Sequence, residues 1–185
     1  MTRKNSIRLR RRCVGAAAVA FAGSIGSVSF AESLASNLEN QSAGTETASD
    51  CCAMAASFTT DDVVHALSSI TLLLASPIPG SAVVTVHADG GLEPGQLVAT
   101  LVAPGAYSPT PAPTAFGVAS PVALDAGTTY WIVVAPEEGE FEWSWTTDET
   151  GTGTGYTGTW AQNLESDLGA GWWSHERYPL QMAVT

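Results

Sequence analysis

Basic residues are almost absent from this 185-residue chain beyond its first twelve positions. Lysine does not occur after Lys4, and the stretch after residue 31 holds one arginine, Arg177, against 18 acidic residues. The net charge of residues 32–185 is therefore −17, and a surface of this sign repels phosphate backbones and anionic lipid headgroups. The charge argues against nucleic-acid binding and against peripheral attachment to an anionic membrane.

The chain also lacks an apolar run long enough to span a membrane. Its longest apolar stretch, residues 13–28, contains three glycines and falls short of the roughly 20 residues that a span needs. It follows a basic segment and precedes Ser29-Phe30-Ala31, which has small residues at the positions that a signal peptidase recognises. We therefore expect a signal peptide over residues 1–31 and a secreted protein, extracellular or associated with the cell surface, with no membrane insertion after processing.

Cysteine is scarce, and after the expected cleavage only the adjacent Cys51 and Cys52 remain. A disulfide between neighbours closes a small strained ring and links no distant segments. Both cysteines lie in the polar segment 32–54, which shows no sustained hydrophobic period and which we interpret as a flexible arm. We expect an intermolecular disulfide through Cys51 or Cys52, or two thiols that remain free.

From residue 55 onward, short apolar runs alternate with Gly, Pro, Ser and Asp. The runs predict seven or eight strands, including residues 67–75, 82–88, 97–102, 114–118, 129–135, 141–147 and 180–184. We interpret Pro77–Gly80 as the turn between the first two of these strands. No segment has the period of an amphipathic helix. The pattern predicts an all-β domain over residues 55–185, a single antiparallel β-sandwich that is jelly-roll-like.

Several motifs occur in a fixed order along residues 55–185. They are Phe-Thr-Thr at 58–60, Leu-x-Ser-Ile-x-Leu at 67–72, a valine strand with Asp-Gly and Pro-Gly at 83–95, and Leu-x-Ala-Gly-Thr-x-Tyr-Trp within 124–134. A Trp-x-x-Thr segment, a glycine-rich turn and a Gly-Trp pair follow them. In this order the chain resembles the choice-of-anchor domain family, type R, of extracellular bacterial and archaeal modules. The resemblance implies a β-sandwich exposed on cell surfaces, without catalytic residues.

Six tryptophans are a notable number for an exported domain of this size. Strand alternation places Trp143 and Trp145 on one face, which we interpret as the face of a core. Trp172 and Trp173 are neighbours in an extended segment and point in opposite directions, so one of them is a candidate for the surface. Flat aromatic rings stack on sugar rings, and a carbohydrate-binding surface made of Trp172, Trp173 and Tyr156 is therefore one interpretation.

A calcium site is a second possibility, because carboxylate oxygens suit this hard cation and extracellular calcium saturates weak sites. The loop from Asp89 to Glu93 offers these two carboxylates as ligands. Asp-Gly is also the commonest hairpin turn, so a purely structural loop is the alternative.

No candidate constellation has the geometry that catalysis requires. Neighbours on one strand cannot flank a sugar from opposite sides, as glycosidases require, and this applies to Glu137, Glu138, Glu140 and Glu142. Consecutive residues such as Ser174-His175-Glu176 cannot adopt the geometry of a catalytic triad. We therefore predict a non-catalytic module with a structural or adhesion role at or outside the cell surface. Its partner would be a cell-surface glycan or protein, and the alternative function is that of a carbohydrate-binding module.

Overall fold

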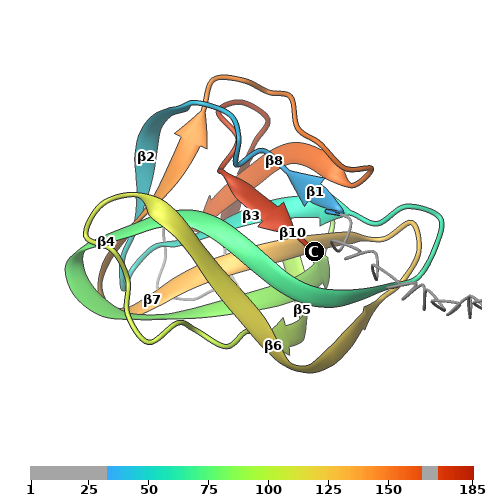
Figure 1. Ribbon diagram of the computed structural model, residues 1–185, viewed down its shortest axis with the longest axis horizontal. Coiled ribbons are helices and arrows are strands. Elements are labelled where there is room, and N and C mark those ends of the chain that lie inside the picture. The colour runs from blue at the N-terminus through green and yellow to red at the C-terminus, as the bar shows by residue number, and fades with distance from the viewer. Residues whose placement is uncertain (1–32, 164–170) are drawn as a thin grey trace, which may run out of the picture. The chain divides into compact units, whose positions relative to one another are not determined.

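The computed structural model describes residues 33–163 and 171–185, and all ten regular elements in these ranges are β-strands (Figure 1). They are β1 (Ala35–Ser36), β2 (Ser42–Ala48), β3 (Ala53–Thr59), β4 (His65–Asp89), β5 (Pro94–Thr100), β6 (Ala112–Leu124), β7 (Thr129–Thr146), β8 (Tyr156–Asn163), β9 (Trp172–His175) and β10 (Met182–Val184). Every pairing between them is antiparallel, which confirms the predicted all-β, antiparallel fold. No helix in the described ranges is long and apolar enough to cross a membrane. The expected signal peptide lies outside the described residues.

Hydrogen bonding joins the ten described strands into one sheet in the order β1-β10-β4-β7-β3-β8-β9, with β2 added to β7 and both β5 and β6 added to β4. β4 has 25 residues and β7 has 18, and Figure 1 shows the two strands running side by side. Strands β2, β3, β5, β6 and β10 each pair directly with one of these two. The paired β4 and β7 therefore form the frame to which the other strands attach.

The predicted turn at Pro77–Gly80 is wrong, because β4 continues through it as one strand. Its pairing with β7 shifts register between Ala75 and Ile78, and again on both sides of Ser81. Proline has no N–H to donate, but it is tolerated in a strand at such irregularities. Two predicted strands are thus the two halves of β4, and the strands predicted at 129–135 and 141–147 are likewise the two halves of β7.

The prediction of a flexible arm over residues 32–54 is also wrong, because β1, β2 and the start of β3 lie in this segment and belong to the sheet. β2 pairs with residues 141–146 of β7, and β1 pairs with β10. The side chains of β2 are exposed or half-buried except for Ala48, so a polar sequence suits this strand. A strand stabilised mainly by backbone pairing leaves no hydrophobic period in the sequence.

The main core draws side chains from both halves of β4, since Ile70 and Leu72 belong to the same buried cluster as Val84 and Val86. The sheet must therefore fold over this core, as Figure 1 shows. The aromatic members of the cluster include Phe58, Phe116, Phe141 and Trp143. A smaller cluster around Trp131 lies on the opposite face of β3, β7 and β8, because Trp131 alternates with core residues along β7.

The two long strands approach each other most closely where the register shifts. A Cβ atom at Gly80 would overlap the carbonyl oxygen of Glu138. A Cβ atom at Gly139, whose φ is +75°, would lie 2.5 Å from the carbonyl oxygen of Ile78. Both obstacles are backbone atoms of the partner strand, so neither can move aside without disturbing the pairing.

Replacing Gly80 by alanine should lower the free energy of unfolding by about 2 kcal/mol, because overpacking displaces backbone there. Gly139→Ala should have a similar effect, since it adds the strain of a positive φ. Urea unfolding of both variants measures the loss. The matched control is Gly117→Ala in β6, which has no atom within 4 Å of its Cβ position. An equal loss in all three variants would contradict this account of the corner.

Candidate functional site

The six tryptophans are distributed unequally between core and surface. Trp131, Trp143 and Trp160 are at most 7% exposed, whereas Trp173 is 64% exposed. Trp145 and Trp172 are half-buried. Each of the three buried indole N–H groups donates a hydrogen bond, to Asp89 Oδ1, to the Gln181 carbonyl and to the Arg177 carbonyl respectively. The buried indoles therefore have structural roles, and Trp173 is the indole that faces solvent.

Trp172 and Trp173 are consecutive residues of β9, and their side chains project in opposite directions. These residues pair with Asn163 and Gln162 of β8, and alternation along the strand places their side chains on opposite faces. Trp172 packs against the cluster around Trp131. As strand alternation predicted, one of the two neighbouring indoles is exposed, and it is Trp173.

Tyr156 lies in a different region. It is six residues along β8 from Gln162, the partner of Trp173, which corresponds to roughly 20 Å at a rise of about 3.3 Å per residue. Its hydroxyl accepts a hydrogen bond from Asn37 Nδ2 at 3.3 Å, and burial raises the pKa of Tyr156. The structure therefore does not bring Tyr156 and Trp173 together into one binding surface.

A hollow of about 550 Å³ adjoins β9 and the segment that follows it. Its wall contains the rings of Trp160, His175 and Tyr178, together with the charged side chains of Glu176 and Arg177. Trp173 lies on the same face of β9 as His175, two residues away. We call Trp173, His175, Arg177 and Tyr178 the β9 aromatic surface.

Ring contacts fix the β9 aromatic surface to the fold. The His175 ring stacks on Trp160 with centroids 4.3 Å apart and an interplanar angle of 21°. The ring of Tyr178, which has a φ of +58°, lies 5.2 Å from that of Trp145. His175 Nε2 is buried and has no hydrogen-bond partner among the described residues.

The sequence prediction missed His175, Arg177 and Tyr178 as members of this surface. They lie close together because the His175 ring stacks on Trp160 and the Tyr178 ring packs against Trp145, with Arg177 between them in the sequence. The one available signal was Arg177, since a single cation in a stretch of 18 acids marks an unusual position.

Asp89 is engaged in the turn between β4 and β5. Its Oδ1 accepts hydrogen bonds from Trp131 Nε1 at 2.7 Å and from the Leu92 amide at 3.1 Å, and its Oδ2 accepts one from the Gly91 amide at 3.2 Å. The carboxylate thus closes the turn and satisfies a buried indole.

Glu93 contributes its backbone to the same turn, where its carbonyl accepts a hydrogen bond from the Gly90 amide at 2.8 Å. Within the ranges that the structure describes, no group of three His, Cys, Asp or Glu side chains is placed to hold a metal ion. The hydrogen bonds of Asp89 support the structural interpretation of the Asp89–Glu93 loop, and the calcium site stays a prediction.

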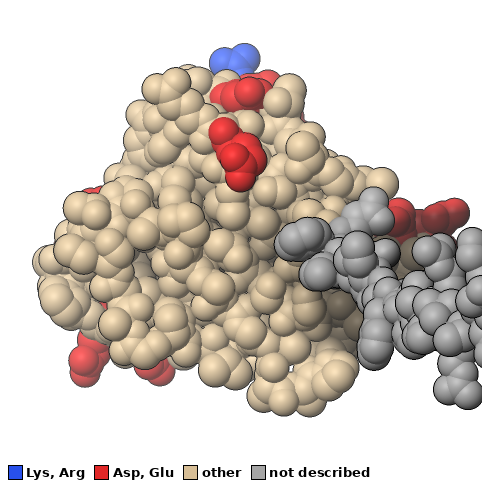
Figure 2. All heavy atoms as spheres, in the orientation of Figure 1, with Lys and Arg blue, Asp and Glu red and all other residues tan. Residues whose placement is uncertain are grey.

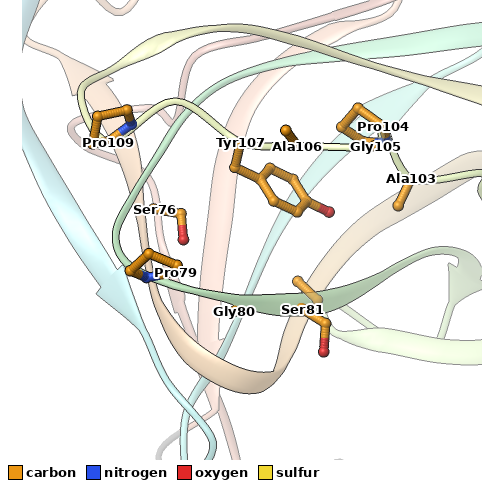
Figure 3. A pocket seen from close by; sticks show the side chains of 11 residues that line it. Ser76, Pro79, Gly80, Ser81, Ala103, Pro104, Gly105, Ala106, Tyr107 and Pro109 are labelled. Carbon is orange, nitrogen blue, oxygen red and sulfur yellow. The ribbon is translucent and has the colours of Figure 1, made fainter.

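A second hollow of about 550 Å³ lies at the corner of β4 (Figure 3). One wall is the bulged part of β4 from Ser76 to Ala82, and the other is the segment from Ala103 to Pro109. The Tyr107 hydroxyl is buried without a partner in the described part of the chain, and burial raises its pKa. All of the lining residues are uncharged. This hollow therefore offers no ionic contact to a ligand, unlike the one beside β9.

No family model, no curated protein and no solved structure matches this chain. Its function must therefore be inferred from its residues and their geometry.

Replacing Asp89 by alanine should lower the free energy of unfolding by about 1 kcal/mol, because Trp131 Nε1 and two amides lose their acceptor. Asp89→Asn, which retains an acceptor oxygen, should lose less. Thermal unfolding in millimolar calcium and in chelator should give the same midpoint for the unaltered chain. A calcium-dependent rise in that midpoint, absent from Asp89→Ala, would instead place an ion in this loop.

Proposed function

We propose that this chain is an exported, non-catalytic module with a structural or adhesion role at or outside the cell surface. It acts by binding a partner through the β9 aromatic surface. The observation that carries the proposal is Trp173, which is 64% exposed beside a hollow lined by the only arginine after residue 31. Exposed tryptophan, tyrosine and arginine side chains are typical of the energetic centres of binding surfaces.

The rigidity of the surface supports the proposal. Trp173 is held on a strand paired with β8, and His175 is fixed by its stacking on Trp160. Tyr178 is likewise held against Trp145. Groups that are already positioned lose little conformational freedom when a partner binds, so more of the contact energy contributes to affinity.

The negative charge of this chain indicates the sign of charge to expect on its partner. Figure 2 shows a face that is largely uncharged, with acidic side chains at its edges and in its upper middle and one basic side chain at the top. The net charge of −17 after residue 31 repels an acidic partner at long range, attracts a basic one and leaves a neutral one unaffected. Arg177 then supplies one contact for a carboxylate or carbonyl group of that partner.

The residues that resemble catalytic groups have other contacts, which supports a non-catalytic role. Ser174 Oγ donates a hydrogen bond to the Leu92 carbonyl at 2.6 Å, while the adjacent His175 stacks on Trp160. Ser174 and His175 therefore project from opposite faces of β9. The motif order that resembles choice-of-anchor modules supports an extracellular location for the same chain.

Carbohydrate binding is the second candidate, and one observation favours it. The hollow next to β9 is lined by the rings of Trp160, His175 and Tyr178, and aromatic rings can stack on a sugar. A sugar platform, however, ordinarily uses more than one exposed ring, and Trp172 packs into the fold. We therefore place adhesion to a partner surface first.

Trp173→Ser and Arg177→Ala should each reduce retention of the labelled chain on the cell-envelope fraction of the producing organism by about tenfold, the size of a moderate hot spot. Neither should change the urea midpoint, since both side chains are exposed. Val64→Ser is the matched control, because Val64 is 66% exposed and lies outside the surface.

Retention that is unchanged in Trp173→Ser would contradict the proposal. Competition of retention by a soluble glycan, with quenching of tryptophan fluorescence that disappears in Trp173→Ser, would establish the carbohydrate-binding alternative in its place.

A further inference from the structure

The tight turn between β2 and β3 carries the two cysteines. Both strands pair with β7 and follow one another along it, and we call residues 49–52 between them the tip. Ser49 and Cys52 exchange backbone hydrogen bonds of 3.0 and 2.9 Å, which leaves Asp50 and Cys51 as a two-residue turn. Both thiols are free, and Cys51 is exposed. The tip is thus a tight turn, held by paired strands, that offers one thiol to solvent.

The two thiols are not equivalent. A hydrogen bond from the Cys52 side chain, and a second from the Ser49 hydroxyl 3.2 Å away, lower the pKa of Cys51. The interaction with Cys51, together with burial, raises the pKa of Cys52. Cys51 is also the exposed thiol of the two, whereas Cys52 is half-buried, so Cys51 is the better placed of the pair to act as a nucleophile.

Backbone geometry opposes a disulfide between these neighbours. Consecutive Cα atoms are about 3.8 Å apart across a trans peptide. Disulfides usually join Cα atoms about 4.4–6.8 Å apart, so a Cys51–Cys52 bond would be strained. The structure describes no other cysteine, since Cys13 lies outside its ranges. Within the described residues, neither cysteine of the tip therefore has a partner for an unstrained disulfide.

The surroundings of the tip are acidic. A hollow of about 420 Å³ is lined by Ser49 and Asp50 of the tip and by Glu137, Glu138 and Glu140 of β7. Four carboxylates therefore line a hollow that adjoins the tip through Ser49 and Asp50, with no basic side chain in the described lining. They attract a cationic reactant and repel an anionic one, including the same acidic tip of a second copy.

We propose that Cys51 is a thiol–disulfide exchange site that captures a cationic disulfide-bearing partner as a stable mixed disulfide. The Cys51 thiol releases its proton, and the thiolate attacks one sulfur of the partner's disulfide. An S–S bond forms to Cys51 Sγ, the partner's S–S bond breaks, and its second sulfur leaves as a thiolate that takes up a proton. One disulfide replaces another, so no separate oxidant is required.

Cys52 does not resolve the product, because its attack on Cys51 would create the strained bond between neighbours. The site would thus hold a partner covalently. This inference uses no residue of the β9 aromatic surface, so it stands or falls separately from the proposed function.

The test uses the reduced chain with Cys13→Ser, so that only the tip carries thiols. At low salt, cystamine, which is cationic, should react at least about tenfold faster than dithiodiglycolate, which is anionic, and high salt should reduce the difference. Intact mass and peptide mapping should find one adduct, on Cys51. Its rate should rise with pH at a lower midpoint than in Cys52→Ala, because the hydrogen bond from Cys52 lowers the pKa of Cys51.

Matched variants complete the experiment. Cys51→Ser should form no adduct, and Glu137→Gln with Glu138→Gln should reduce the preference for cystamine. Any of four results would overturn the proposal: equal rates for the two probes at low salt, an adduct on Cys52, a Cys51–Cys52 disulfide as the main product, or a dimer joined through two Cys51 residues.

Discussion

The pairing of β4 with β7 is the constraint on which the rest of the structure depends. Their register runs from Leu74 opposite Trp143 to Ala88 opposite Tyr130, through a corner where the bulged β4 crosses Gly139. Five other strands pair directly with this frame, and β1, β8 and β9 attach through β10 and β3. The close approach at the corner lets the sheet fold over one core, because a side chain there would separate the strands.

The same frame positions the candidate site. Alternation along β7 sends Tyr130 into the main core and Trp131 to the opposite face, where β3 and β8 extend the sheet. β9 pairs with β8 at the edge of the sheet. Alternation along β9 packs the half-buried Trp172 against the cluster around Trp131 and leaves Trp173 exposed. The exposed surface is thus a consequence of sheet order, and the stacking of His175 on Trp160 fixes it further.

The parts of the fold that depend on local sequence could be predicted. Apolar runs bounded by turn residues indicate antiparallel strands, and period-two alternation explains why Trp172 and Trp173 separate. The parts that depend on distant partners could not. β2 is polar and is held by β7, and Pro77–Gly80 has the composition of a turn but continues as strand because β7 pairs on both sides of it. His175 and Tyr178 join the site through rings that arrive from other strands.

The central claim is that this chain binds its partner through the β9 aromatic surface, and hydrogen exchange on the bound chain tests it most directly. Comparing free chain with chain bound to the envelope fraction, the account predicts slowed exchange in residues 172–178, with the corner hollow around Tyr107 unchanged. Slowed exchange around Tyr107 and Pro79, with residues 172–178 unaffected, would contradict the claim and place the binding surface at the other hollow.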